Sequence, residues 1–569
     1  MLTQIYLTCW LEKNLMGIIT LTANIIDIKT IFIVMNLGKN KMRCADALVK
    51  ILESNDVEFV FGHPGEQILP FYDALRSSKI KHILMRHEQG AVHAADGYAR
   101  VSGKFGVCIS TGGPGALNLA MGIATAFKDS IPMIVITGDV DTDLKGTNVF
   151  QDIDIEGVFR PITLKTFHIE DPDDGILKLK KAIEIIKQGK TGPVHLNFPK
   201  NVLNACVDAS LVTTGDVEYN DISINDIDDA IKLIERSKRP LILAGTGIIW
   251  AHAVDKLRDF SIKYNIPVAT TYSARGVLPE DHPLCLGMMG LRGTTAANFA
   301  GKNCDLLIAM GCRFSERTVL GIGTPEIIHV NLDSEVLEGN VKIQGDVGQF
   351  LDKIEDINVE NTDEWLNELK NHRRTYEIKT NYTDIPIKPQ RAVKEILDAS
   401  DDSTTISDAG THTTWVTLLK KVTRPSSLLF SGGFGPMGYG LPAAIGASLA
   451  DTGERVVLVV GDGGFQMTMQ ELAVIAQEKI PILICIINNC CLGIIKQWQD
   501  MHYRERYEVE LENPDFLEIA DAYGIKSKRV NAPGEIFNAV KNALKLEEPY
   551  LIDIMVDKEE GIILPKIKP

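Results

Sequence analysis

Short apolar runs alternate with segments of helical periodicity from Met42 to the C-terminus. The first part of this stretch holds the apolar runs VEFVFG, KHILMR, FGVCIS and PMIVITGD, with helical spacing between them, as in CADALVKILESN. Continuous apolar runs of this length are typical of strands buried on both faces of a parallel sheet, with helices covering those faces. The pattern therefore predicts an α/β protein built from doubly wound parallel sheets.

The same alternation recurs in two further units. RPLILAGTG, IPVATT, DLLIAMG and EIIHVNLD are the apolar runs of the second unit, and RVVLVVGDGG and IPILICIINN belong to the third. The polar segments DASLVTTGDVEYNDIS and EDINVENTDEWLNELKNHRRTYEIKTNYTD separate the units. We expect three domains, over residues 42–207, 226–360 and 388–569.

Residues 1–41 do not follow this pattern. Their segment LMGIITLTANIIDIKTIFIVMNL is apolar but carries Asp27 and Lys29 near its middle, which a membrane-spanning helix would bury at high cost. No small-residue cleavage site follows, as a secretory signal would require. Because the regular pattern begins at Met42, we interpret residues 1–41 as an extension that a mis-assigned start would explain.

Composition and charge narrow the classes of partner. The chain of 569 residues is 45% hydrophobic, as in an ordinary globular protein, and its formal net charge is -16. So acidic a chain is poorly suited to nucleic acid or to an anionic membrane as its main partner, but an anionic ligand is not excluded, because a local pocket can oppose the global field. The ten cysteines include no CxxC pair. Their spacing predicts neither a zinc site nor a disulfide framework and is typical of reduced thiols in a cytoplasmic protein.

The segment RHEQGAVHAADGYAR, residues 86–100, predicts a helix with a carboxylate at its start. Ala91, Ala94, Ala95 and Ala99 form a narrow face suited to close packing, and Glu88 precedes it. The residues alone leave two interpretations open. Glu88 is either a solvated acid of the first turn, where the helix dipole favours it, or an acid that holds a proton for a bound heterocycle.

A second candidate site lies in the third unit. VVLVVGDGGF predicts a strand that ends beside Asp462, and ILICIINNCC predicts a strand that ends at Asn488 and Asn489. The 24 residues between Gly463 and Asn488 suffice for one crossover helix, TMQELAVIAQE, so both strand ends meet at the carboxyl edge of one sheet. Carboxylate and amide oxygens suit Mg²⁺, and glycines let a diphosphate approach the backbone. The two motifs together predict a magnesium and diphosphate site.

These motifs resemble those of thiamine diphosphate (ThDP) enzymes. GDGGF followed by NN is similar to their metal and diphosphate motif, and RHEQGAVHAADGYAR and GGPGALNLAMGIATAF are similar to their pyrimidine-binding domain. SGGFGPMGYGLPAAIGA, LGIIKQWQ and NPDFLEIADAYGI resemble the catalytic subunit of the acetolactate (acetohydroxyacid) synthase family. LGMMGLRGTTAANFA and MGCRFSERT resemble that family's FAD-binding region. The resemblance runs in order from about Met42 to the C-terminus.

The resemblance implies a fold and a reaction. The three domains would be a pyrimidine-binding domain, a central FAD-binding-like domain and a diphosphate-binding domain. The reaction would be the decarboxylating condensation of pyruvate with a second 2-keto acid, pyruvate or 2-oxobutyrate, for branched-chain amino-acid biosynthesis. In relatives the two halves of each cofactor site come from different chains, so we expect a homodimer or homotetramer with active sites at the subunit interface. The sequence leaves open whether a small regulatory subunit binds.

The resemblance also implies cofactor-binding residues. Glu88 would be the catalytic acid that hydrogen-bonds N1′ of the aminopyrimidine, and Met437 would hold the cofactor bent. Mg²⁺ would be bound by the side chains of Asp462 and Asn489 and by the backbone carbonyl of Cys491. The other ThDP positions carried over are Gly113, Pro114, Asn118, Gly410, Thr411, His412, Gly461, Gly463, Gly464 and Leu492, with Thr411 standing where the family has Gln.

Substrate and FAD positions follow from the same match. Arg317 would hold the carboxylate of the second 2-keto acid, and Trp498 would test its alkyl group. Phe150 and Gln151 would line the access channel, and Gly65 lies in a loop that approaches the reacting carbons. The FAD contacts carried over are Arg160, Gly290, Arg292 and Arg313, and the FAD would be structural.

Several residues depart from the family pattern. The first loop has Glu66 and Gln67 where the family has Gly-Gly, and Leu164 stands where the family has a Lys near the channel mouth. An added carboxylate at residue 66 could repel a second keto acid or favour a different donor. Two alternatives therefore stay open: another ThDP-dependent 2-oxoacid decarboxylase or carboligase, and a non-catalytic relic of the scaffold.

Overall fold

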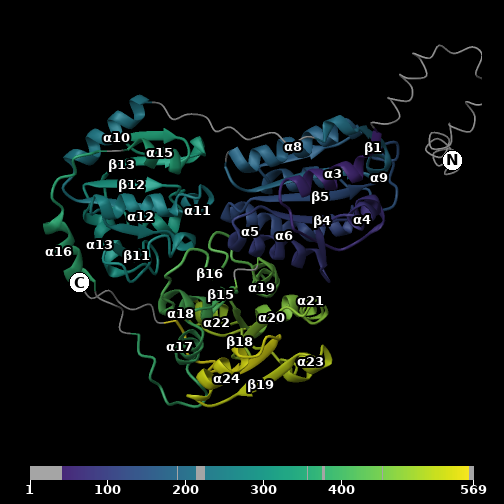
Figure 1. Ribbon diagram of the computed structural model, residues 1–569. Helices are drawn as coiled ribbons and strands as arrows, with labels where there is room; N and C mark the ends of the chain where they lie inside the picture. Colours follow the sequence, from purple (N-terminus) through teal and green to yellow (C-terminus); the bar gives the residue numbers. More distant parts are fainter. Residues whose placement is uncertain are drawn as a thin grey trace, which may run out of the picture.

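The computed structural model describes residues 41–188, 190–212, 224–354, 356–373, 378–450 and 453–562. In this part of the chain three six-stranded sheets are each flanked by helices (Figure 1), and every strand pair within them is parallel. The predicted α/β fold of doubly wound parallel sheets is confirmed. The extension, up to residue 40, and most of the first polar connection, residues 213–223, lie outside the described residues.

The N-terminal sheet has the strand order β3-β2-β4-β5-β7-β6. Its strands are β2 (Phe59–Gly62), β3 (Lys81–Leu84), β4 (Gly106–Ser110), β5 (Met133–Asp139), β6 (Lys165–His168) and β7 (Pro193–Pro199). Its helices are α3 (Cys44–Ser54), α4 (Leu69–Leu75), α5 (Glu88–Ser102), α6 (Pro114–Asp129), α7 (Ile155–Phe159), α8 (Pro172–Gln188) and α9 (Lys200–Asn204), with β1 (Lys41–Arg43) pairing antiparallel with β8 (Cys206–Asp208).

The C-terminal sheet repeats this arrangement, with the order β16-β15-β17-β18-β20-β19. Its strands are β15 (Thr404–Ser407), β16 (Leu428–Leu429), β17 (Val456–Gly461), β18 (Ile482–Asn488), β19 (Lys526–Val530) and β20 (Tyr550–Met555). Its helices are α17 (Pro389–Ala399), α18 (Thr411–Leu419), α19 (Gly440–Leu449), α20 (Asp462–Thr468), η7 (Met469–Glu471), α21 (Leu472–Glu478), α22 (Gly493–His502), α23 (Phe516–Ala522) and α24 (Glu535–Leu544). The expected single crossover helix is thus three short pieces, and helix begins at Asp462 itself.

The central sheet has a different order, β11-β10-β9-β12-β13-β14, in which successive strands spread outward from β9 in both directions. This is the strand order of dinucleotide-binding folds. Its strands are β9 (Pro240–Ala244), β10 (Val268–Thr270), β11 (Cys285–Met288), β12 (Leu306–Met310), β13 (Glu326–Asn331) and β14 (Val341–Gln344). Its helices are α10 (Ile224–Arg236), α11 (Gly247–Trp250), α12 (Val254–Lys263), α13 (Thr295–Asn303), α14 (Glu316–Val319), α15 (Val347–Lys353) and α16 (Asp363–His372).

Helices α5 and α19 join the N-terminal and C-terminal domains (Figure 1). A Cβ on Gly97 would lie 2.1 Å from the Ala443 carbonyl oxygen, and one on Gly446 would lie 1.8 Å from that of Ala94. The small-residue face of α5 therefore packs directly against the backbone of α19, as its composition predicts. One hydrophobic core consequently runs through both domains.

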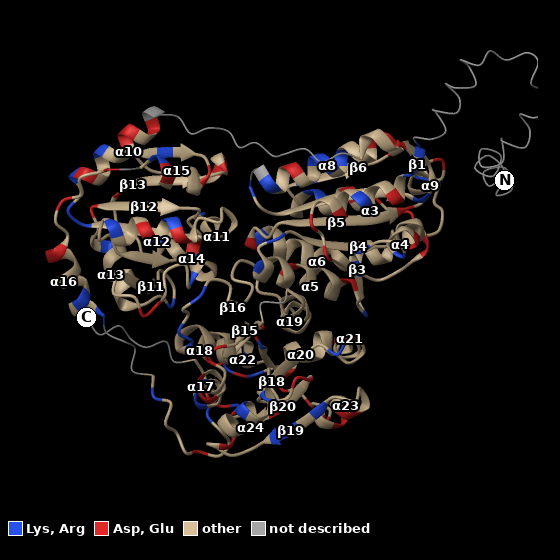
Figure 2. Ribbon diagram, in the orientation of Figure 1, with Lys and Arg blue, Asp and Glu red and all other residues tan. Residues whose placement is uncertain are grey.

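Charged side chains lie mainly on outer helices such as α10 and α16, while the strands are mostly uncharged (Figure 2). The apolar runs IPVATT, DLLIAMG and IPILICIINN of the sequence correspond to β10, β12 and β18, all of whose residues are buried. Among the described helices, none is both long and apolar enough to cross a membrane.

Candidate functional site

The predicted diphosphate residues gather where the C-terminal sheet changes direction. The chain passes from β15 to β16 on one side and then to β17 on the other, so the loops after β15 and β17 diverge and leave a crevice. Gly410 precedes α18, and Gly461 precedes α20. A Cβ on Gly461 would lie 3.3 Å from the His412 ring, so the two loops meet at this histidine.

The groups at this crevice fit an anionic ligand. The His412 ring is buried, and its Nε2 atom has no hydrogen-bond partner among the described residues. Burial lowers the pKa of His412 to about 4, so the ring is neutral at pH 7. Helices α18, α20 and α22 begin here without a side-chain cap, although the Gly493 N–H of α22 donates to the Cys491 carbonyl oxygen at 2.9 Å. Free N–H groups at helix starts are the usual donors to phosphate oxygens.

The predicted magnesium ligands lie in the same region. The Asp462 carboxylate is buried, and its Oδ2 accepts a 2.7 Å hydrogen bond from Asn513 Nδ2. The Asn489 Oδ1 atom accepts from the backbone N–H of Cys491 at 3.1 Å. In the part of the chain that is described, no group of three or more His, Cys, Asp or Glu side chains could hold a metal. A metal here would be held by one carboxylate with amide and carbonyl oxygens, a set that suits Mg²⁺.

Two polar residues that sequence reasoning missed hold this site. Asn513 bridges the two strand ends, because its Nδ2 also donates to Asn488 Oδ1 at 3.0 Å. Asp408 lies at the end of β15, and its buried carboxylate accepts from the N–H groups of Gly438 and Gly440. Burial raises the pKa of Asp408 to about 6. Asp408 thereby fixes the loop that carries Met437.

Met437 lies beside the predicted metal and diphosphate residues. A Cβ on Gly463 would be 3.2 Å from Met437 Cε and 3.2 Å from Leu492 Cδ2. Gly464 approaches the Asp408 carboxylate in the same way, and a Cβ on Gly493 would meet both Asn489 and Thr411. The predicted ThDP positions of the C-terminal domain therefore form one group.

The N-terminal domain gathers a second group of predicted residues. Glu88 is the first residue of α5, and its Oε2 accepts a 2.9 Å hydrogen bond from Asn118 of α6. Gly113 has φ +56° and precedes Pro114, the first residue of α6. A Cβ on Gly113 would lie 2.7 Å from the backbone oxygen of Gln151. These four positions and the loop of Gln151 are therefore adjacent.

The loop after β2 joins this group. A Cβ on Gly65 would lie 2.4 Å from Thr111 Cβ, in the loop after β4. The Gln67 side chain is buried, whereas that of Glu66 turns to the surface and pairs with Lys200 at 3.0 Å. The carboxylate at residue 66 is therefore partly neutralised.

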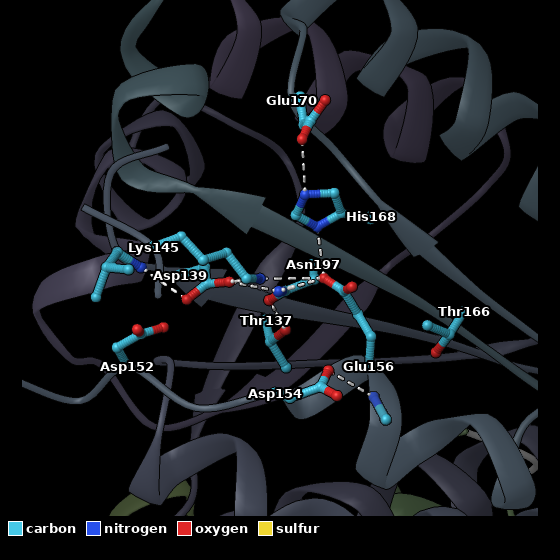
Figure 3. Close-up of polar contacts among 12 residues, drawn as sticks. Thr137, Asp139, Lys145, Asp152, Asp154, Glu156, Thr166, His168, Glu170 and Asn197 are labelled. Atoms are coloured by element: carbon cyan, nitrogen blue, oxygen red, sulfur yellow. Dashed lines mark hydrogen bonds and ion pairs between the residues drawn. The ribbon is translucent and has the colours of Figure 1, made fainter. Parts of the chain in front are cut away.

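A polar cluster lies at the carboxyl edge of the same sheet (Figure 3). Lys145 Nζ lies 2.6 Å from Asp139 Oδ2 and 3.3 Å from Glu156 Oε1. His168 Nδ1 lies 2.6 Å from Glu156 Oε1, and Asn197 Nδ2 donates to both carboxylates, at 2.6 Å and 2.9 Å. Burial by itself would raise the pKa of Glu156, but these partners outweigh it and lower that pKa. The cluster ties the loop between β5 and α7 to the sheet.

That loop carries Phe150 and Gln151. The Phe150 side chain is 77% exposed, and that of Trp498 on α22 is 56% exposed. Large apolar side chains with this exposure are suited to a contact that the single chain does not make.

The central domain has a pocket at its own change of strand direction, between β9 and β12. Gly247, Gly311, Arg313, Arg317 and Asp333 are among the residues that line it. Gly290 abuts the pocket, since its Cβ would lie 2.1 Å from the Arg317 carbonyl oxygen, and the buried Nε of Arg292 has no partner within the described ranges. Arg160 lies exposed in η3 (Arg160–Ile162) and is not among these lining residues. A glycine-lined pocket with arginines at a switch point suits a dinucleotide.

The two groups of predicted ThDP residues share no hydrogen bond with each other in the described part of the chain. Across the residues that the structure describes, no hydrogen bond links Glu88 or Asn118 to Asp462, Asn489 or His412. Asn118 is exposed, and Glu88 is half-buried. The pyrimidine-side residues are therefore partly open to solvent, whereas Asp462 and His412 are buried.

The chain is similar to known proteins over most of its length. Three family models match in order: the thiamine pyrophosphate enzyme N-terminal TPP binding domain over residues 42–158, the central domain over 227–354 and the C-terminal TPP binding domain over 408–554. A probable acetolactate synthase large subunit from Methanocaldococcus jannaschii is 43% identical over 565 residues, covering 93% of this chain and 94% of that protein. The acetolactate synthase large subunit of Corynebacterium glutamicum is 38% identical over 552 residues, covering 92% and 88%. That of Porphyra purpurea is 38% identical over 551 residues, covering 92% and 93%.

Proposed function

The chain belongs to the thiamine pyrophosphate enzymes and, within them, to the acetolactate synthase large-subunit family, and we propose that it makes acetolactate. The reaction joins two pyruvates into 2-acetolactate and releases one carbon dioxide, and 2-oxobutyrate would be the alternative acceptor. Thiamine diphosphate, when bound, supplies the carbon nucleophile and the electron sink for decarboxylation.

The observation that carries the proposal is the group of residues at the C-terminal switch point. The unpartnered His412 Nε2 and three uncapped helix starts suit a diphosphate, and Asp462, Asn489 and the Cys491 carbonyl suit its Mg²⁺. Met437 lies over the same group and would occupy the space between the cofactor's rings.

Glu88 would hold the proton that the aminopyrimidine needs. Its carboxylate is fixed by Asn118 at 2.9 Å, and Gly115 leaves room for its Oε1, because a Cβ there would lie 2.9 Å away. A carboxyl held in this way can share a proton with a ring nitrogen throughout the reaction.

Substrate selection would fall to residues around the half-sites. Arg317 can bind the acceptor carboxylate through its planar guanidinium, and the exposed Trp498 and Phe150 can enclose its alkyl group. FAD would occupy the central pocket as a structural cofactor, with Arg313 among its contacts.

We infer that the working enzyme is at least a homodimer. The exposed Asn118 and the exposed apolar side chains of Phe150 and Trp498 support this assembly, because a second copy would cover them and supply the missing half of each site. The naming of the relatives as large subunits supports binding of a separate small subunit.

The test is turnover by the purified protein with thiamine diphosphate, Mg²⁺, FAD and pyruvate. Acetolactate, measured as acetoin after acid treatment, is the expected product, and Glu88→Gln is expected to abolish it. Acetaldehyde without acetolactate would make the protein a decarboxylase, and no turnover with cofactor bound would overturn the proposed substrate.

A further inference from the structure

We infer that Glu471, in the C-terminal domain, is a positioning residue for Glu88 in the N-terminal domain. The inference rests on the proposed function, because it assigns Glu471 a role in orienting the acid that serves the cofactor. Glu471 lies at the end of η7, on the other side of the interface from α5.

Both oxygens of the Glu471 carboxylate hold the backbone that leads into α5. Oε2 accepts from the Arg86 N–H, and Oε1 accepts from the His87 N–H, each at 3.0 Å. The Glu471 side chain is fully buried. Glu88 follows these two residues directly, so a carboxylate from another domain fixes the backbone just before its helix. Two hydrogen bonds from consecutive N–H groups to one buried carboxyl fix the backbone at both residues.

The interface is shaped to admit this carboxylate. A Cβ on Gly90 would lie 2.5 Å from Glu471 Oε1, so a side chain at residue 90 would displace the carboxylate. The Arg86 side chain adds to the same anchorage, because its Nη2 donates to Gln477 Oε1 at 2.7 Å.

Glu88 must be accurately placed to share a proton with the aminopyrimidine. A proton is shared with a ring nitrogen only across a hydrogen-bond distance, and a misplacement of about 1 Å costs about 100-fold in rate. Glu471 is the last residue of η7, and η7 directly follows α20, the helix that begins at Asp462, so Glu471 connects the backbone before Glu88 to the segment that carries Asp462.

The experiment compares Glu471→Gln with a matched control. Glutamine keeps the length but offers an NH₂ group to one of the two N–H donors. Glu478→Gln removes a carboxylate that pairs with Lys81 at 2.9 Å and accepts from Gln477 at 3.0 Å, but that makes no hydrogen bond to the Arg86 and His87 N–H groups. Two readouts are taken: amide hydrogen exchange of residues 86–90 in the protein without cofactor, and the rate of deuterium exchange at thiazolium C2 of bound thiamine diphosphate.

Glu471→Gln is expected to speed amide exchange at residues 86 and 87 and to slow C2 exchange about 10- to 100-fold, with the thiamine diphosphate affinity from calorimetry changed less than threefold. Glu478→Gln is expected to leave both exchange rates within twofold of wild type. Gly90→Ala, which displaces the carboxylate without removing it, is expected to reproduce the Glu471→Gln result, so that the inference remains testable if one variant fails to fold.

Wild-type rates of both exchanges in folded Glu471→Gln would overturn the inference. A Glu478→Gln variant as slow as Glu471→Gln would also overturn it, because the effect would then belong to the interface in general. If the wild type exchanges C2 but makes no acetolactate, the proposed function fails while the two exchange measurements still decide the role of Glu471.

Discussion

Gly446→Ala tests the close packing of α19 against α5, because Gly446 lies directly against the α5 backbone. The new Cβ would lie 1.8 Å from the Ala94 carbonyl oxygen and 2.7 Å from the Tyr98 nitrogen, whereas real Cβ contacts are essentially never under 3.0 Å. The two helices would have to separate by about 1 Å, because backbone cannot rotate away as a side chain can.

Two effects oppose each other in this variant. Alanine in a helix interior is favoured over glycine by about 1 kcal/mol, while overpacking costs about 1–3 kcal/mol and more where backbone must move. Because the new Cβ would clash with backbone atoms of α5, we expect the cost of overpacking to exceed the gain in helix propensity. The free energy of unfolding should then fall by about 1–2 kcal/mol. Activity is expected to fall about 100-fold, since Glu88 begins one helix and Met437 lies just before the other.

Urea unfolding and acetolactate formation measure the two consequences. Gly561→Ala is the control, because its Cβ would meet Gln497 at 3.4 Å, an ordinary contact. A Gly446→Ala protein that is as stable and as active as this control would refute the close packing of the two helices.

Two further predictions follow from buried charges. Lys145→Met removes the lysine that pairs with the carboxylates of Asp139 and Glu156, so we expect the free energy of unfolding to fall by about 1–3 kcal/mol. We also expect faster amide exchange over residues 140–154, and unchanged exchange there would contradict the role of the cluster in tethering this loop. Burial raises the pKa of Glu471 to about 7 from an ordinary value of 4.5, so the folded protein binds this proton more tightly than the unfolded chain and its stability falls as pH rises through that interval. Between pH 4.5 and pH 7, the free energy of unfolding should decline by about 3 kcal/mol less in Glu471→Gln than in the wild type, as measured by unfolding at these two pH values. An identical pH dependence in both proteins would contradict the raised pKa of Glu471.

Much of the fold could be predicted from local pattern. The apolar runs mark the central strands because a strand buried on both faces must be apolar along its length. The helix after Glu88 and its close-packing alanine face were also predictable, since small residues suit a face pressed against a neighbour. The neighbour itself was not, because nothing local to residues 86–100 specifies a partner that lies about 350 residues further along the chain.

The supporting residues of the site show the same limit. The motif around Asp462 could be read from its glycines, whereas Asn513 and Asp408 act through loops that only the folded sheet brings together. Glu471 sits in an ordinary apolar helical pattern, and no feature of its neighbours in sequence marks it as a cap for another domain.

The fold class and the chemical groups of the candidate cofactor site can be read from consecutive residues, because these encode strand burial and motif chemistry. Tertiary structure decided which loops meet at each switch point, that α5 rests on α19, and that Glu66 turns toward Lys200. It also gave Glu88 and Asp462 separate hydrogen-bond partners, Asn118 and Asn513. These outcomes depend on contacts between distant segments, whose free energies arise only when the whole chain has packed.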